Sequence, residues 1–131
     1  MPELVTALVV MPQERRSILL DHLRGIPARV LTASSCSELG DVLRKSPAVS
    51  LVLTDLALPD GSWFDVLNRV SDTRTDAEVV VCARLADERL WTQVLEAGGF
   101  DLLVEPYEVA ELHRILDRAM AAHAPRLAAA S

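Results

Sequence analysis

Short hydrophobic runs alternate with amphipathic segments along the chain, and this alternation limits the possible folds more than any other feature. Five runs have the length and composition of buried strands, at residues 4–10, 28–33, 48–54, 77–82 and 100–104. A segment with helical spacing follows each run, beginning near residues 13, 35, 62, 87 and 106. Repeated strand–helix units are typical of a parallel sheet with helices on both faces. We therefore predict an α/β fold of the flavodoxin-like, doubly wound type, with five parallel strands in the order 2-1-3-4-5.

The chain has 131 residues, which is enough for one hydrophobic core, and no linker or internal repeat divides it. Ser35 with Glu38, and Ser62 with Asp65, have the spacing of helix N-terminal caps, and Gly98 marks a helix end. The last helical pattern fades near residue 122. We expect one domain over residues 1–123 and a short flexible tail at residues 124–131.

The composition argues against several classes of function. The net charge of −6 disfavours a nucleic-acid partner, because such binding needs a basic face. No hydrophobic run approaches the roughly 18 residues that span a bilayer, so we expect no membrane partner. The two cysteines are isolated, and none of the three histidines has metal-site spacing. We therefore expect no disulfide, no zinc site and a cytoplasmic location.

One carboxylate ends the third hydrophobic run. Asp55 follows residues 51–54, and a Pro59-Asp60-Gly61 turn comes soon after it. Ligands of open α/β sheets bind at the carboxyl ends of the strands, so Asp55 is a candidate functional residue. Alternatively, Asp55 only caps the turn that follows it.

Several short motifs in the right order resemble receiver domains of bacterial two-component response regulators. They are Asp55 with its Leu-Pro-Asp-Gly turn, Cys82-Ala83-Arg84 after the fourth strand, Leu-Glu-Ala-Gly-Gly at residues 95–99, and Val104-Glu105-Pro106-Tyr107 after the fifth. The resemblance covers residues 4–122. It implies transfer of a phosphoryl group from a phosphohistidine to Asp55, whose carboxylate would be the nucleophile.

This resemblance also implies partners that the chain lacks. The family holds magnesium with an acidic pair after the first strand, where this chain has Met11 and Pro12. Cys82 stands at the family's Thr or Ser position, and Glu105 stands at its lysine position. Neither Met11 nor Pro12 supplies the oxygen ligands that magnesium needs, so we expect no magnesium or other cofactor.

Three other positions bear on this site. Leu102 replaces the family's switch aromatic, and Glu14 lies two residues too late to replace the acidic pair. Arg84 is the one nearby cation that the sequence suggests, and it is either a partner of Asp55 or a solvated loop residue. Asp55 and Glu105 would repel each other by about 1 kcal/mol in water and by more in a partly buried site.

These departures predict an atypical receiver domain, or pseudo-receiver. It would act as a protein-interaction module in phosphorelay signalling, would not be an enzyme, and would not undergo magnesium-dependent phosphorylation. The alternative is a phosphorylatable receiver that accepts a phosphoryl group on Asp55 from a histidine kinase. A small α/β enzyme or nucleotide-binding protein is a third possibility, but the chain has no glycine-rich phosphate-binding motif.

The expected partner is a signalling protein, such as a histidine kinase or an output protein. A homodimer through the fourth helix, fifth strand and fifth helix is also expected. Its charged residues would be Glu88, Arg89, Glu96, Asp101, Glu111, Arg114 and Arg118, although a mixed solvated face is the commoner explanation for such charges. Trp63 and Trp91 are either interface anchors or partly core residues.

Overall fold

The computed structural model describes residues 5–26, 28–46, 48–73, 77–85 and 87–130, with the backbone alone at residues 120 and 122–130. Residues 1–4 and 131, which include the expected start of the first strand at Leu4, lie outside the described residues, as does the side chain of His123. No helix in the described ranges is long and apolar enough to cross a membrane.

Five parallel strands form the central sheet. They are β1 (Val5–Val10), β2 (Ala28–Ala33), β3 (Leu51–Asp55), β6 (Glu78–Ala83) and β7 (Asp101–Val104). Their spatial order is β2-β1-β3-β6-β7, which is 2-1-3-4-5 in chain order and confirms the predicted fold. In register, Asp55 of β3 lies beside Cys82 of β6. Because the strands are parallel, their carboxyl ends meet at one edge of the sheet.

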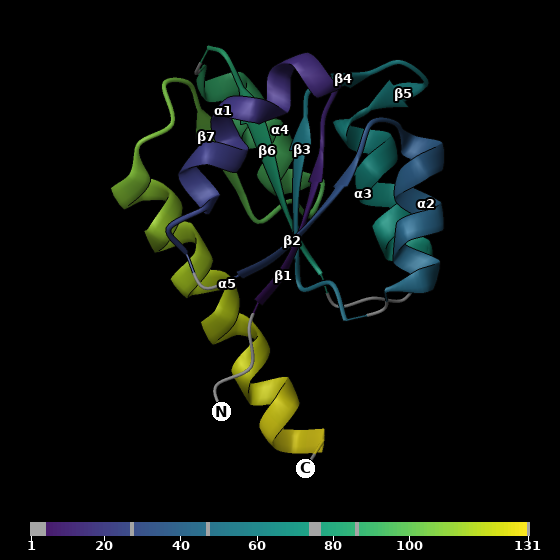
Figure 1. Ribbon diagram of the computed structural model, residues 1–131, viewed down its shortest axis with the longest axis vertical. Helices are drawn as coiled ribbons and strands as arrows, with labels where there is room; N and C mark the ends of the chain where they lie inside the picture. The colour runs from purple at the N-terminus through teal and green to yellow at the C-terminus, as the bar shows by residue number, and fades with distance from the viewer. Residues whose placement is uncertain (1–4, 27, 47, 74–76, 86, 131) are drawn as a thin grey trace.

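Five helices cover the two faces of this sheet (Figure 1). They are α1 (Gln13–Leu23), α2 (Cys36–Lys45), α3 (Trp63–Asp72), α4 (Glu88–Glu96) and α5 (Val109–Ala130). Helices α1 and α5 pack against alternate strand residues such as Val9, Leu53 and Leu103. The remaining strand residues face the other helices: Leu8 and Val52 belong to the cluster of α2 and α3, and Val81 to that of α4. Burial on both faces explains why the strands are hydrophobic throughout.

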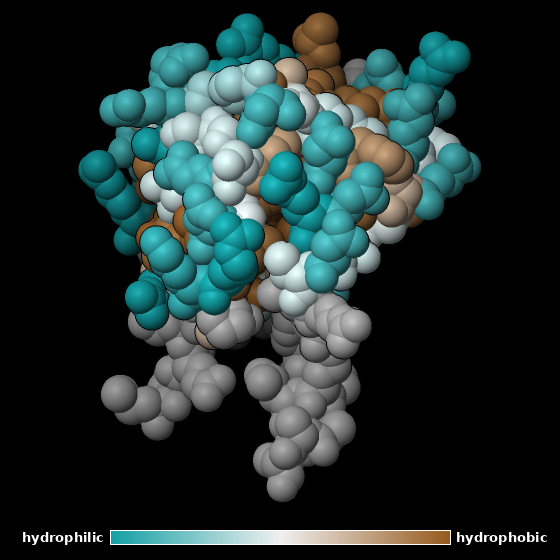
Figure 2. All heavy atoms as spheres, turned by 90° about the vertical axis from the view of Figure 1, so that its right-hand side faces the viewer, coloured by the Kyte–Doolittle hydropathy of each residue, from teal (hydrophilic) through white to brown (hydrophobic). Residues whose placement is uncertain are grey.

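Most exposed side chains of α2 and α3 are polar, with Phe64 as the exception. Figure 2 shows the face over α2 and α3, where hydrophilic side chains cover most of the surface and hydrophobic atoms lie between them. The Ser62–Asp65 capping box forms as predicted. At α2, the Ser35 hydroxyl accepts a bond from the Glu38 N–H, but the Glu38 carboxylate reaches the N–H of Ser34, one residue earlier than in a capping box.

Three features differ from the sequence prediction. Strand β3 begins at Leu51, three residues after the predicted start at residue 48, since the N–H of Val49 bonds back to the Ser46 carbonyl in a turn. A small antiparallel hairpin, β4 (Ala57–Leu58) and β5 (Gly61–Ser62), lies between β3 and α3. Helix α5 starts at Val109 instead of residue 106 and continues to Ala130, past the predicted end near residue 122. The backbone of residues 124–130 is therefore helical where we expected no regular structure, and flexibility of this segment stays a prediction.

Candidate functional site

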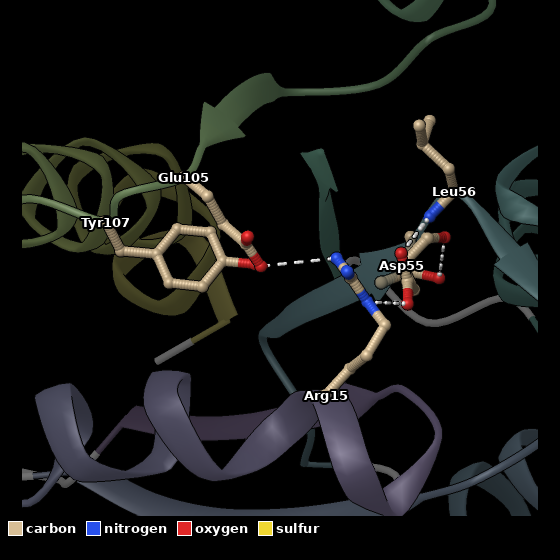
Figure 3. Close-up of polar contacts among 6 residues, drawn as sticks. Arg15, Asp55, Leu56, Glu105 and Tyr107 are labelled. Carbon is tan, nitrogen blue, oxygen red and sulfur yellow. Dashed lines mark hydrogen bonds and ion pairs between the residues drawn. The ribbon is translucent and has the colours of Figure 1, made fainter. Parts of the chain in front are cut away.

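Side chains from four parts of the chain, three of them charged, meet at the carboxyl edge of the sheet. Asp55 ends β3, Cys82 lies beside it on β6, and Glu105 directly follows β7. Arg15 comes from the first turn of α1, which begins just after β1. Figure 3 shows the Arg15 side chain lying between Asp55 and Glu105.

Both carboxylate oxygens of Asp55 accept hydrogen bonds. The Nε of Arg15 donates to Oδ2 at 2.6 Å, and the backbone N–H of Leu56 donates to Oδ1 at 2.8 Å. Only 6% of the Asp55 surface is exposed. A buried carboxylate is stable only when it is paired and hydrogen-bonded, and Arg15 supplies the opposite charge here.

Arg15 also binds the second carboxylate. Its Nη2 donates to Oε1 of Glu105 at 3.3 Å, and the Tyr107 hydroxyl donates to the same oxygen at 3.2 Å. Burial of the guanidinium lowers the pKa of Arg15, but the negative charges of Asp55 and Glu105 raise it by more, so the pKa is raised overall. One cation therefore holds two carboxylates and links α1, β3 and the segment after β7.

Comparison with known proteins gives no match to a protein-family model. Among curated proteins, the transcriptional regulator NtrC of Azospirillum brasilense is 28% identical over 112 residues, which cover 84% of this chain and 23% of that protein. The rice (subsp. japonica) response regulator ORR3 is 28% identical over 106 residues, which cover 79% of this chain and 80% of that protein. The chain spans 15%, 23% and 50% of the first three curated relatives.

Solved structures show the same fold. The receiver domain of an HD domain-containing protein from Pseudomonas fluorescens Pf-5 matches with a TM-score of 0.78 and 19% identity, covering 95% of this chain and 99% of that one. The beryllofluoride-activated NtrC4 receiver domain dimer matches with a TM-score of 0.76 and 18% identity, covering 87% and 94%. Together, these likenesses support a receiver domain of the two-component response regulators. In this structure, Asp55 stands at the end of the third sheet strand, as the hydrophobic run that it ends predicted.

The residues at the family's magnesium position do not fit that ion. Met11 is fully buried in the core between the sheet and helices α1 and α5, and Pro12 has no side-chain oxygen. Glu14 is exposed on the outer side of α1. Within the described ranges, no group of three or more His, Cys, Asp or Glu residues could hold a metal ion. Magnesium prefers oxygen ligands, and Oδ2 of Asp55 is already paired with the cationic Arg15 side chain at 2.6 Å.

Cys82 offers no hydroxyl and no accessible thiolate. Its side chain is completely buried, and burial followed by the field of Asp55 raises the pKa of the thiol far above its usual range. Cys82 therefore lies at the floor of the site as a small hydrophobic residue.

The structure corrects the identity of the cation. Arg84 is exposed, and in the described part of the chain the ion-pair partners of Asp55 and Glu105 are both Arg15. Sequence reasoning missed Arg15 because the residues of α1 were assigned only to its helical pattern. One available signal was position: the first turn of a helix that follows a parallel strand lies at the ligand-binding edge.

The structure also places the other residues that the sequence singled out, around α4 and β7. Leu102 is buried beneath α4, in a cluster with Val81, Ala83 and Val94, against which half-buried Trp63 packs. Trp91 on α4 is 49% exposed. On the other side of β7, Asp101 pairs with Arg118 at 3.0 Å, and the Arg118 guanidinium lies over the Phe100 ring.

Proposed function

We propose that this receiver domain is atypical: it acts as a protein-interaction module in phosphorelay signal transduction, and Asp55 is not phosphorylated in a magnesium-dependent reaction. The supporting observation is the Arg15–Asp55 ion pair at 2.6 Å, which occupies the carboxylate that would be the nucleophile. On this proposal the chain is not an enzyme and uses no cofactor.

Charge balance supports the same conclusion. Asp55 and Glu105 carry two negative charges, and Arg15 supplies the one cation that contacts them among the described residues. A phosphoryl group on Asp55 would add negative charge a few ångströms from Glu105. Like charges at about 4 Å repel by about 4 kcal/mol at the effective dielectric constant near a protein surface. Receiver chemistry offsets such repulsion with a lysine and a divalent cation, and here Glu105 and Met11–Pro12 stand at those positions.

The partner we propose is a signalling protein, such as a histidine kinase or an output protein, in the cytoplasm. A homodimer through α4, β7 and α5 is a second proposal, and the NtrC4 receiver domain of similar fold is a dimer. Asp101 and Arg118 already bind each other, so the charged contacts would fall to Glu88, Arg89, Glu96, Glu111 and Arg114. Trp91 and Leu95, exposed one helical turn apart on α4, are the apolar side chains suited to such a contact.

The alternative function is a receiver that accepts a phosphoryl group on Asp55 from a histidine kinase. One observation favours it: the Arg15 guanidinium touches Asp55, and a guanidinium is a good ligand for phosphoryl oxygens. Arg15 would then release the carboxylate and bind the phosphoryl oxygens instead.

Incubation with acetyl phosphate and magnesium separates the two functions. The products are resolved on a phosphate-affinity gel beside an Asp55→Asn control and a receiver of known activity. We expect no shifted band for the wild-type chain while the known receiver shifts. A shifted band that Asp55→Asn abolishes would establish the alternative function and overturn the proposal.

A further inference from the structure

A short hairpin connects Asp55 directly to the start of α3. The N–H of Leu56 donates to Oδ1 of Asp55 at 2.8 Å, and the carbonyl of Leu56 accepts from the N–H of Trp63 at 3.1 Å. Between these two residues, Ala57 pairs with Ser62 in the β4–β5 ladder. The backbone of Leu56 therefore links the two: its N–H binds the candidate site and its carbonyl binds Trp63.

The tip of this hairpin is fixed to another helix. The Asp60 carboxylate accepts bonds from the N–H groups of Cys36 and Ser37, at 2.8 and 3.0 Å, in the first turn of α2. The next residue, Gly61, is closely surrounded, since an added Cβ would lie 2.6 Å from Oδ2 of Asp65 and 3.0 Å from Sγ of Cys36. Because the tip is held, a displacement that begins at Asp55 is directed along the hairpin toward Trp63.

Trp63 reaches the packing beneath α4. It is half-buried against the cluster of Val81, Ala83, Val94 and Leu102, which also contacts Leu90 of α4, and it is the one aromatic residue there among the described residues. Its ring meets that of Phe64 edge to face, with centroids 5.8 Å apart and an interplanar angle of 89°. Phe64 is 51% exposed. Trp63 thus contacts both a buried helix interface and a surface aromatic.

We propose that Trp63 couples the pairing of Asp55 with Arg15 to the packing of α4 and to the exposed Phe64. When a partner draws Arg15 or Asp55 out of the ion pair, two hydrogen bonds shift together: the one from the Leu56 N–H to the Asp55 carboxylate and the one from the Trp63 N–H to the Leu56 carbonyl. The Trp63 ring then repacks against Leu90 and Val94. This coupling holds whether or not Asp55 accepts a phosphoryl group, so its test is independent of the phosphorylation experiment.

Arg15→Gln in a Trp91→Phe background tests the coupling. The background leaves Trp63 as the one tryptophan of the chain, so its emission and its quenching by acrylamide report on this ring. The matched control is Arg16→Gln, because the neighbouring Arg16 binds Ser34 and not Asp55. We expect Arg15→Gln to shift the Trp63 emission and to raise amide exchange in residues 88–96 at least about fivefold. Arg16→Gln should change neither.

A second substitution tests the route through the ring. Trp63→Leu added to Arg15→Gln should abolish the extra exchange in α4, measured against Trp63→Leu alone. If Arg15→Gln does not fold cooperatively, Asp55→Asn replaces it, because this change removes the ion pair and keeps an acceptor for the Leu56 N–H. Equal Trp63 emission and α4 exchange in the site variant and in Arg16→Gln overturns the coupling. If Arg15→Gln raises amide exchange in α4 by the same factor with and without Trp63→Leu, the role of Trp63 is overturned.

Discussion

Replacing Arg15 with glutamine should destabilise the protein by about 2–3 kcal/mol. The substitution leaves Asp55, whose side chain is 9% exposed, without an opposite charge. Breaking a fully buried ion pair by removing one partner costs roughly 3–5 kcal/mol. We expect less here because the Arg15 side chain is 15% exposed and because Asp55 keeps the bond from the Leu56 N–H. Glu105 is 28% exposed and adds little, since water screens an accessible charge.

Urea unfolding measures this loss. At a typical slope of about 2 kcal/mol per M, the midpoint should fall by about 1 M or more. Arg16→Gln removes a half-buried arginine from the same helical turn, with one bond to Ser34 at 3.2 Å, and should cost about 1 kcal/mol or less.

The double variant Arg15→Gln with Asp55→Asn identifies the cause of the loss. Without the carboxylate charge, most of the stability lost in the single Arg15 variant should return. If Arg15→Gln and Arg16→Gln unfold at the same urea concentration, or if the Asp55 change restores nothing, the ion pair does not stabilise this site and the electrostatic reasoning is wrong.

Three further predictions concern other groups. Both thiols should resist modification at pH 8 until the protein unfolds, because burial raises the pKa of Cys36 to about 11 and that of Cys82 further; rapid labelling of either in native protein contradicts their burial. The hydrogen bonds from the Cys36 and Ser37 N–H groups lower the pKa of Asp60 in the folded state. The stability that the ionised Asp60 carboxylate contributes is therefore fully present above about pH 4 and is lost as the pH falls through the folded-state pKa. The melting temperature of the wild type should therefore fall more steeply below about pH 4 than that of Asp60→Asn, and parallel curves would show that these bonds do not favour the carboxylate. Tyr107→Phe removes the bond to Glu105 and should cost about 1 kcal/mol in urea unfolding, whereas an unchanged midpoint would mean that this hydroxyl contributes nothing.

Much of the fold could be predicted from local patterns. The buried strands are hydrophobic along their whole length because both faces are covered, and the turn after Asp55 and the cap at Ser62 are signalled by adjacent residues. The β4–β5 hairpin was missed because each of its strands has two residues, too few to show alternation. The full length of α5 was missed because its last residues show no hydrophobic periodicity.

The sequence by itself predicted the strand order, from the succession of strand–helix units, and the place of Asp55 at the carboxyl edge. It also fixed which side chains follow the first strand, where Met11 and Pro12 carry no side-chain oxygen. Only the tertiary structure decided which cation Asp55 meets. Arg15 and Asp55 are 40 residues apart, and Arg15 and Glu105 are 90 apart. No local pattern encodes such pairs, because contact depends on how α1 packs on the sheet and on which way a long side chain turns. Arg84 is nearer to both carboxylates in sequence and remains exposed, whereas Arg15 extends from the first turn of α1 into the space between them.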